Sequence, residues 1–300
     1  MARVVVLGST ASGKSDVAMT AAQRAGNVRI VCADSMQVYR RMDIGTAKPT
    51  AEDRATVPHH CLDIAEPSER FTVARYAEEV QAARETIRSV GAHELVVGGT
   101  GLYITAVVDG LTMPGEWPAI RAELEADPDT AGLHARLQEL DPVATTKMEP
   151  GNRRRIIRAL EVCLGSGEPF SSFGEGVANF PPVDTVQIGL LWERDALRER
   201  IKVRVHRMVE AGLVGEVQSL LDEPDGMSDT ARQALGYKEF IEHIEGRWTL
   251  DQAIDATILR TQQFAVRQER WFRRDPRIRW VEVRNDPIAE VTPLVAAALA

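Results

Sequence analysis

A glycine-rich loop that ends in a lysine and a serine lies near the beginning of this chain. Residues 8–15 read Gly-Ser-Thr-Ala-Ser-Gly-Lys-Ser and match the phosphate-binding pattern G-x-x-x-x-G-K-[ST] at every fixed position. An apolar run at residues 4–7 precedes the loop, and a helical pattern follows it. Loop amides and a helix start bind anions, Lys14 adds a positive charge, and Ser15 can hold Mg²⁺ through its hydroxyl. The sequence therefore predicts a site for a diphosphate or a triphosphate.

Polar residues also follow two further predicted strands. Asp34 comes after the apolar run 29–32, and the glycine-rich turn 98–101 comes after the run 95–97. Ligands of a parallel α/β sheet gather beyond the carboxyl ends of its strands, so Asp34 and Thr100 are expected to face the phosphate site. Asp34 could hold a metal through water, act as a general base, or only cap a turn or helix. The glycine turn could equally be an ordinary strand-to-helix connection. Spacing alone does not separate these interpretations.

Rows of arginine with helical spacing form a second group of candidates. Arg200, Arg204 and Arg207 lie at i, i+4 and i+7, on one face of a helix predicted over residues 195–212. Guanidinium groups bind phosphate through paired hydrogen bonds, although surface rows of charge are more often solvated. A similar row has Trp271 and Phe272 beside it and could bind RNA or pack in the core; its members are Arg267, Arg270 and Arg274.

The composition limits the class of protein. The chain has 300 residues, of which 44% are hydrophobic, and no apolar stretch approaches the length of a membrane span. The three cysteines are widely spaced, which argues against a disulfide framework or a thiolate zinc site, and no signal-peptide pattern is present. We expect a cytoplasmic protein without a membrane partner. The net charge of −8 argues mildly against nucleic acid, but screening leaves local basic patches such as residues 153–158 effective.

Alternating strand and helix patterns position these residues. They predict an α/β fold, with a P-loop core whose parallel sheet is flanked by helices. One of the flanking helices is expected at residues 73–89, with Thr72 as its N-cap. The strand pattern stops after residue 111. Helical stretches and loops follow, including a Gly-, Ser- and Pro-rich loop at residues 165–182.

Strand patterns resume at residues 185–191 and again at 279–283. A helical insertion into the P-loop core is the simplest account of this order. We therefore predict a catalytic core made of residues 1–111 and 183–300, and a helical insertion domain, contacting RNA, made of residues 112–182.

Several longer strings resemble the bacterial tRNA dimethylallyltransferase (tRNA isopentenyltransferase) family. The likeness covers nearly the whole chain, and two of its strings are far more specific than the P-loop, namely Asp-Ser-Met-Gln-Val-Tyr at 34–39 and Gly-Thr-Ala-Lys-Pro at 45–49. Two departures, Ser15 for a frequent Thr and Ser9 for a common Pro, leave the motif's chemistry intact. The remaining matches are Gly-Gly-Thr-Gly-Leu-Tyr at 98–103, Arg-Ile-Ile-Arg-Ala-Leu-Glu at 155–161, Gln-Ala-Leu-Gly-Tyr-Lys-Glu at 233–239, and Arg267-Gln268 with Trp271-Phe272.

The resemblance implies transfer of a dimethylallyl group from dimethylallyl diphosphate to the exocyclic amine of the adenosine just 3′ of the tRNA anticodon, with release of diphosphate. It implies Mg²⁺ as cofactor, a monomer that binds the anticodon stem-loop, and Asp34 as general base, with Lys14, Ser15 and Arg204 as the other catalytic groups. The implied diphosphate ligands are Gly8, Ser9, Thr10, Ala11, Ser12, Gly13, Lys14, Ser15 and Arg204. The implied tRNA contacts are Asp34, Ser35, Met36, Gln37, Thr100, Arg121, Arg154, Arg155, Arg158, Gln233, Gly236, Tyr237 and Lys238.

Three other functions remain compatible with the motifs. An adenylate isopentenyltransferase would use the same donor with a free nucleotide, although a free nucleotide would not need the arginines of the insertion. A small-molecule kinase would bind ATP in the P-loop and place Asp34 against an acceptor hydroxyl. A nucleotide-binding switch or RNA-binding module would carry out no transfer. Presenting each acceptor with labelled donor would separate these possibilities.

Overall fold

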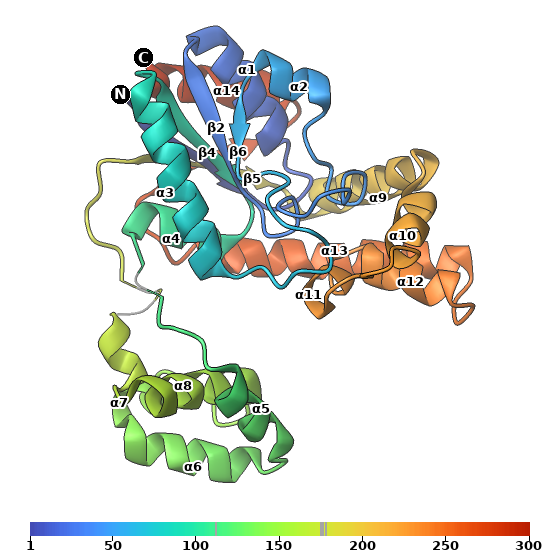
Figure 1. The fold of residues 1–300 in the computed structure, drawn as a ribbon. Helices are drawn as coiled ribbons and strands as arrows, with labels where there is room; N and C mark the ends of the chain where they lie inside the picture. The colour runs from blue at the N-terminus through green and yellow to red at the C-terminus, as the bar shows by residue number, and fades with distance from the viewer. Residues whose placement is uncertain (112, 175–176, 178) are drawn as a thin grey trace. The chain divides into compact units, whose positions relative to one another are not determined.

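In the computed structural model, which describes residues 1–111, 113–174, 177 and 179–300, six parallel strands form a sheet in the order β3-β2-β4-β1-β5-β6 (Figure 1). The interior strands are buried on both faces, which explains their uninterrupted apolar runs. The predicted α/β class with a parallel sheet is confirmed. The strands are β1 (Arg3–Gly8), β2 (Val28–Ala33), β3 (His59–His60), β4 (His93–Gly98), β5 (Val186–Trp192) and β6 (Ile278–Val283).

Helices cover both faces of the sheet because successive strand residues point to opposite sides. In β1, Val4 and Val6 pack with α1 (Lys14–Ala25) and α14 (Pro287–Leu299). Val5 and Leu7 belong to the core cluster on the other side. That side is covered by α3 (Val73–Ser89), α4 (Gly101–Asp109) and α13 (Leu250–Phe272).

Local signals place several of these elements where the sequence predicts them. The Thr72 side chain accepts a hydrogen bond from the Arg75 amide and so caps α3, which has the expected bounds. One strand was missed, because β3 has only two residues and pairs at the edge of the sheet with β2. The remaining helices of this part of the chain are α2 (Ala51–Thr56), α9 (Arg194–Glu210), α10 (Leu213–Leu221), α11 (Asp229–Arg232) and α12 (Tyr237–Ile244).

The chain divides into two compact units. The core unit comprises Met1–Asp109 and Phe180–Ala300, and the helical unit comprises Gly110–Asn179. No strand occurs among the described residues of the helical unit. Its apolar centre includes Leu124, Leu137 and Leu160. The elements of the helical unit are α5 (Pro118–Ala126), α6 (Thr130–Leu140), α7 (Pro142–Thr146), α8 (Arg153–Ser166) and the 3₁₀ helix η1 (Phe170–Phe173).

The loop expected at residues 165–182 is therefore only partly a loop. Helix α8 continues to Ser166, and η1 occupies the segment Phe170–Phe173. Ser171 accounts for this extra order, since its amide and hydroxyl both donate to the carboxylate of Asp141, at 2.7 and 2.8 Å. A buried partner far away in the sequence leaves no trace in local composition. Residues 175, 176 and 178 of the expected loop, and residue 112 at the start of the expected insertion, lie outside the described residues.

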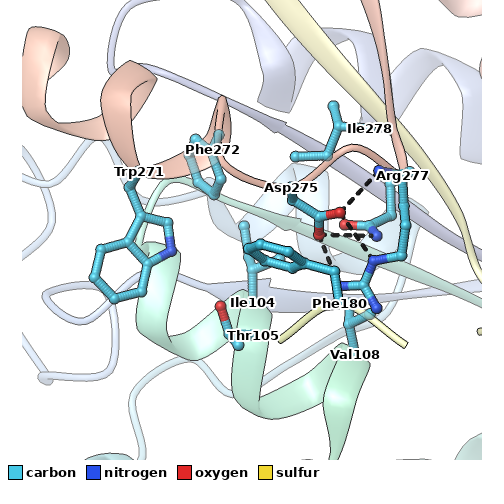
Figure 2. Close-up of a pocket in the computed structure, with 10 residues that line it drawn as sticks. Ile104, Thr105, Val108, Phe180, Trp271, Phe272, Asp275, Arg277 and Ile278 are labelled. Carbon is cyan, nitrogen blue, oxygen red and sulfur yellow. Dashed lines mark hydrogen bonds and ion pairs between the residues drawn. The ribbon is translucent and has the colours of Figure 1, made fainter. Parts of the chain in front are cut away.

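One arginine, Arg277, contacts the chain both where it leaves the core unit and where it re-enters it. Arg277 donates to the carboxylate of Asp109 at 2.6 Å and to the carbonyl oxygen of Pro181 at 2.8 Å. Its guanidinium lies over the Phe180 ring, 5.4 Å from the ring centre, and also pairs with Asp275 at 2.7 Å. Figure 2 shows Arg277, Asp275 and Phe180 among the residues that line a small cavity beside α4 and α13. The two chain segments that lead into and out of the helical unit are thus bonded to one side chain of the core unit.

Candidate active site

The P-loop connects β1 to α1 and has a tightly constrained backbone. Gly13 adopts a φ of 86°, in the left-handed region that favours glycine. A Cβ atom at this position would also lie 2.6 Å from Cγ of Pro287 in α14. The fixed glycine of the motif is therefore required both by the backbone and by the helix that packs on it.

Side chains from distant elements hold the carbonyl groups of this loop. Trp192, at the end of β5, donates its indole N–H to the Ser12 carbonyl at 2.9 Å. Arg200 in α9 donates to the Ala11 carbonyl at 2.8 Å and stacks over the Trp192 ring at 4.3 Å. Arg200 therefore supports the loop itself. The Thr10 amide is also engaged, since it donates to Oε1 of Gln268 at 2.8 Å, which leaves the Thr10 hydroxyl for a ligand.

Two cations, Lys14 and Arg204, lie beside the loop, and none of the described carboxylates forms an ion pair with either. Burial, followed by the positive charge of Arg204, lowers the pKa of Lys14 to about 8, against the opposing effects of Asp34 and Asp16. Burial also lowers the pKa of Arg204. Among the described residues, Arg204 has no hydrogen-bond or ion-pair partner, and Lys14 donates only to the Ser9 carbonyl, at 3.3 Å. A desolvated pair of like charges is the environment that an anionic ligand would relieve.

Asp34 follows β2 and has two differently placed carboxylate oxygens. Oδ1 accepts from the amides of Met36 and Gln37, at 2.8 and 3.4 Å, so the turn-capping interpretation is correct for this oxygen. Within the described part of the chain, Oδ2 has no hydrogen-bond partner. Thr100, after β4, accepts from the Ser35 amide at 3.0 Å and so ties the two strand ends together. The Asp34 side chain is therefore held rigidly with one oxygen available to accept a proton.

A cavity of about 1270 Å³ opens above the P-loop within the core unit. Lys14, Ser15 and Arg204 line it, and so do Arg200 and Arg207, which places the whole predicted arginine row at the cavity. Arg207 is exposed, whereas Arg200 and Arg204 are half-buried, so the solvated-face interpretation applies to Arg207 alone.

The loop 43–49 also lines the cavity, and a side chain of α10 holds its backbone. Glu216 in α10 accepts from the amides of Asp43, Ile44 and Gly45, at 3.0, 2.7 and 3.1 Å. The hydroxyl of Tyr237 donates to the same carboxylate at 2.6 Å. Burial, together with the Glu216 charge, raises the pKa of Tyr237 well above its ordinary value, so the phenol keeps its proton.

Lys48 fixes the other end of that loop. Its side chain is fully buried, and the ammonium group contacts the Tyr39 carbonyl and the carboxylates of Asp43 and Asp63 at 2.6 to 2.7 Å. The specific Gly-Thr-Ala-Lys-Pro string thus contributes a buried ion pair to the cavity wall. Neither Glu216 nor this role of Lys48 was predicted, because both depend on partners distant in the sequence.

The residues implied as tRNA contacts fall into exposed, half-buried and buried sets, and the half-buried set is Asp34, Ser35, Met36, Thr100, Arg121, Arg158 and Lys238. Arg154 and Arg155 are exposed on α8, and Gln233 is exposed beside α12, where it accepts from Lys238 at 2.9 Å. Tyr237 is fully buried, as its bond to Glu216 requires. The remaining buried members are Gln37, which donates to the carbonyls of Thr46 and Ala47, and Gly236.

Two further arginines of the set are bonded inside the helical unit. Glu161 is 1% exposed and pairs with Arg121 at 2.8 Å and with Arg158 at 3.1 Å. The Glu161 carboxylate also accepts from the Trp117 amide, and Arg158 donates to the Gly115 carbonyl. Arg121 and Arg158 therefore join α5 to α8. The structure brings together the P-loop, Arg204, Asp34 and Thr100 in the core unit, whereas these arginines belong to the other unit.

Two searches of the described residues limit other functions. No group of three or more His, Cys, Asp and Glu side chains is arranged to hold a metal ion by itself. None of the helices described is both long enough and apolar enough to cross a membrane.

Comparisons with known proteins show which family the chain is similar to. A family model described as IPP transferase matches residues 37–275. A tRNA dimethylallyltransferase of Paenarthrobacter aurescens is 46% identical over 93% of this chain and 90% of its own length. One of Streptomyces coelicolor is 45% identical over 99% of this chain and 94% of its own length.

Solved structures give the same result. The tRNA isopentenylpyrophosphate transferase of Bacillus halodurans is 38% identical, with a TM-score of 0.70 over 99% of this chain and 96% of its own. A eukaryotic dimethylallyltransferase, solved acting on tRNA, is 25% identical, with a TM-score of 0.84 over 98% of this chain and 77% of its own. The family model matches most of the chain, and the two bacterial relatives are more than 40% identical over at least nine-tenths of it. The chain therefore belongs to the IPP transferase family.

Proposed function

We propose that this chain transfers a dimethylallyl group from dimethylallyl diphosphate to the exocyclic amine of the adenosine next to the anticodon of a tRNA, on its 3′ side. The observation that carries the proposal is the pair of desolvated cations, Lys14 and Arg204, beside a carboxylate with one free oxygen, Asp34. The names of the family's curated bacterial members support the substrates.

The reaction needs both halves of this arrangement. As the allylic carbon–oxygen bond breaks, two electrons leave with the diphosphate, and the charge that accumulates there is stabilised by Lys14, Arg204 and the loop amides. The adenine amine is a poor nucleophile because its lone pair is delocalised into the ring. It forms the new carbon–nitrogen bond while its proton passes to Oδ2 of Asp34. The products are the modified adenosine, diphosphate and a proton.

Magnesium fits this site as a partner of the diphosphate. Ser15 is exposed at the cavity, and no cluster of carboxylates competes for the ion among the described residues. This matches a Mg²⁺ ion that is held by one hydroxyl and by phosphate oxygens, since Mg²⁺ is commonly bound through few protein groups and several substrate oxygens or waters. The ion would neutralise part of the diphosphate charge. Lys14 and Arg204 would hold the remainder.

We infer that tRNA is bound through exposed groups on both units. Arg154 and Arg155 in the helical unit are free to contact phosphates, whereas Arg121 and Arg158 shape that surface from inside. In the core unit, Ser35 and Thr100 lie beside Asp34 and are suited to the edge of an unstacked base. We propose that the part of the tRNA bound in this way is the anticodon stem-loop, and that the protein acts as a cytoplasmic monomer.

The test is a comparison of acceptors with labelled dimethylallyl diphosphate. Unmodified tRNA should become labelled, and AMP should not, while ATP with candidate alcohols should give no phosphorylated product. Labelling of AMP alone would support a free-nucleotide prenyltransferase, and phosphorylation from ATP would support a kinase.

Asp34→Asn tests the base in the same assay. The amide keeps an oxygen for the turn but cannot take the proton, so turnover should fall roughly a hundredfold or more with diphosphate affinity nearly unchanged. Asp195→Asn, a distant exposed carboxylate in α9, is the matched control and should leave turnover intact. Near-normal turnover of Asp34→Asn would exclude Asp34 as the base.

A further inference from the structure

Gln268 joins two loops of the candidate site through a single buried amide. It lies in α13 and is 7% exposed. Its Oε1 accepts from the Thr10 amide at 2.8 Å, and its Nε2 donates to the Gly99 carbonyl at 2.8 Å. A Cβ atom at Gly99 would lie 2.4 Å from Nε2, so a side chain there would displace the amide. Both hydrogen-bonding ends of Gln268 are therefore used by backbone groups of the site.

The two backbone groups belong to different parts of the candidate site, one to the P-loop and the other to the segment beside Asp34. Thr10 is part of the loop that takes the diphosphate. Gly99 precedes Thr100, whose hydroxyl accepts from the amide of Ser35, the residue after Asp34. The amide of Thr100 is also fixed, since it donates to the Ala33 carbonyl at 3.2 Å. A continuous set of hydrogen bonds thus connects the diphosphate loop, through Gln268 and Thr100, to the segment that carries Asp34.

An amide suits this position because it offers one donor and one acceptor. The Thr10 N–H needs an acceptor, and the Gly99 carbonyl needs a donor. Leucine would leave both groups unpaired, and an ionised glutamate would satisfy Thr10 while facing the Gly99 oxygen with a second acceptor. A protonated glutamate could satisfy both. The requirement for one donor and one acceptor at Gln268 is therefore open to direct test.

We propose that Gln268 is a positioning residue that sets the P-loop, and with it the donor's diphosphate, at a fixed distance from Asp34. The inference rests on the proposed prenyl transfer, because it concerns the geometry between leaving group and base. Such geometry acts on the chemical step, where small displacements of reacting groups reduce the rate strongly. Gln268 itself is not among the residues that line the cavity.

The first experiment compares Gln268→Leu and Gln268→Glu with the wild type at saturating tRNA. Both variants should lower kcat roughly tenfold or more at pH 8, with the KM for donor changed less than about threefold. Gln263→Glu, an exposed position on the same helix, is the matched control and should leave both constants unchanged. A rise in the donor KM alone would overturn the positioning role, and so would an unchanged kcat.

The pH profile separates positioning from general loss of packing. Burial would raise the pKa of the new carboxyl in Gln268→Glu, and its protonated form restores the donor to Gly99. The ratio of its kcat to that of the wild type should therefore rise as pH falls from 8 to 6, whereas the ratio for Gln268→Leu should stay flat. Referring each rate to the wild type removes any titration that both proteins share. A flat ratio for Gln268→Glu would contradict the proposal.

Amide hydrogen exchange at Thr10 gives a readout that does not depend on turnover. The exchange should be slow in the wild type and at least tenfold faster in Gln268→Leu, measured at a temperature where both remain folded. If the wild type labels no tRNA while Thr10 is protected in this way, the proposed function fails and the link between the loops stands. If the wild type transfers the prenyl group and Thr10 exchanges at the same rate in both proteins, the link fails and the proposed function stands.

Discussion

Three arginines of the helical unit are bonded within their own fold, whereas the cations beside the P-loop of the core unit have no carboxylate partner among the described residues. Arg121 and Arg158 share the buried Glu161, and Arg153 donates to three backbone carbonyls near the end of α5. Arg204 in the core unit has no such partner among the described residues, and burial lowers its pKa. The same residue type thus plays opposite parts in the two units.

The difference shows how a ligand site can be told from structural charge. A buried charge costs free energy unless a partner compensates for it. In the helical unit the protein supplies that partner, and the arginines contribute to stability. In the core unit the compensation is left to a ligand, which makes Lys14 and Arg204 the better indicators of function. Arg154 and Arg155 form a third group. Both are exposed, so water solvates their charges and no protein partner is needed to offset burial.

Among the variants that test this difference between the units, removal of Glu161, the carboxylate partner in the helical unit, should have the largest effect. Glu161→Ala would leave Arg121 and Arg158 without their carboxylate and the Trp117 amide without its acceptor. We expect a loss of about 2 kcal/mol in the free energy of unfolding of the helical unit, which is roughly 30-fold in its equilibrium constant. Amide exchange in α5 and α8 measures this change. Diphosphate binding serves as the control and should be unaltered; undiminished protection in these helices would remove the structural role of the pair.

Removing the unpaired cation should act on binding instead of stability. Arg204→Ala should raise the donor KM roughly tenfold or more, because a charged hydrogen-bond donor to the diphosphate is lost. Relief of a buried charge should leave the melting temperature equal to or above that of the wild type. Arg198→Ala, an exposed position on the same helix, is the control. An unchanged KM would exclude Arg204 as a ligand of the diphosphate.

The exposed pair should affect only the RNA. Arg154 and Arg155 replaced together by glutamine should weaken tRNA binding severalfold and reduce the slope of log affinity against log salt by roughly 1 to 2, as expected for lost phosphate contacts. Arg158→Gln should instead lower the stability of the helical unit, because its guanidinium bonds Glu161 and the 114–115 backbone. An unaltered salt slope in the double variant would exclude both residues from the RNA-binding surface.

The smallest effect concerns pH. The pKa of Lys14 is lowered to about 8, so the free enzyme loses this charge as pH rises through 8, well below the ordinary lysine value. Donor affinity should therefore fall by about threefold between pH 7 and 9. Lys14→Arg keeps its charge over this range and should remove this step from the profile, whatever its effect on the absolute affinity. A wild-type profile that is flat up to pH 10 would contradict the lowered pKa.

Local signals in the sequence are enough for much of the fold. The P-loop pattern, the Thr72 cap and the apolar runs each depend on residues a few positions apart, so the core helices and strands could be predicted from them. The spacing of Arg200, Arg204 and Arg207 likewise places all three at one cavity. What spacing could not show is their different roles, since Arg200 turns to the Ala11 carbonyl and a tryptophan from another strand.

The supports of the site depend on long-range contacts that no motif contains. Glu216 binds amides more than 170 positions earlier in the chain, and Gln268 reaches Thr10 across 258 positions. Tyr237 is part of a recognisable string, but only its burial against Glu216 shows that the side chain faces inward. Contacts between elements therefore decide which residues of a motif are available to a ligand.

The Arg277 junction has a consequence for how this architecture can be altered. Because Asp109 and Pro181 are both bonded to one guanidinium, the two segments that connect the core unit to the helical unit lie close together. Replacing residues 110–179 by a short linker would leave the hydrogen bonds of Gln268 and Glu216 in the core unit unchanged. The junction thus holds the two ends of the insertion together within the core unit, independently of the helices between them.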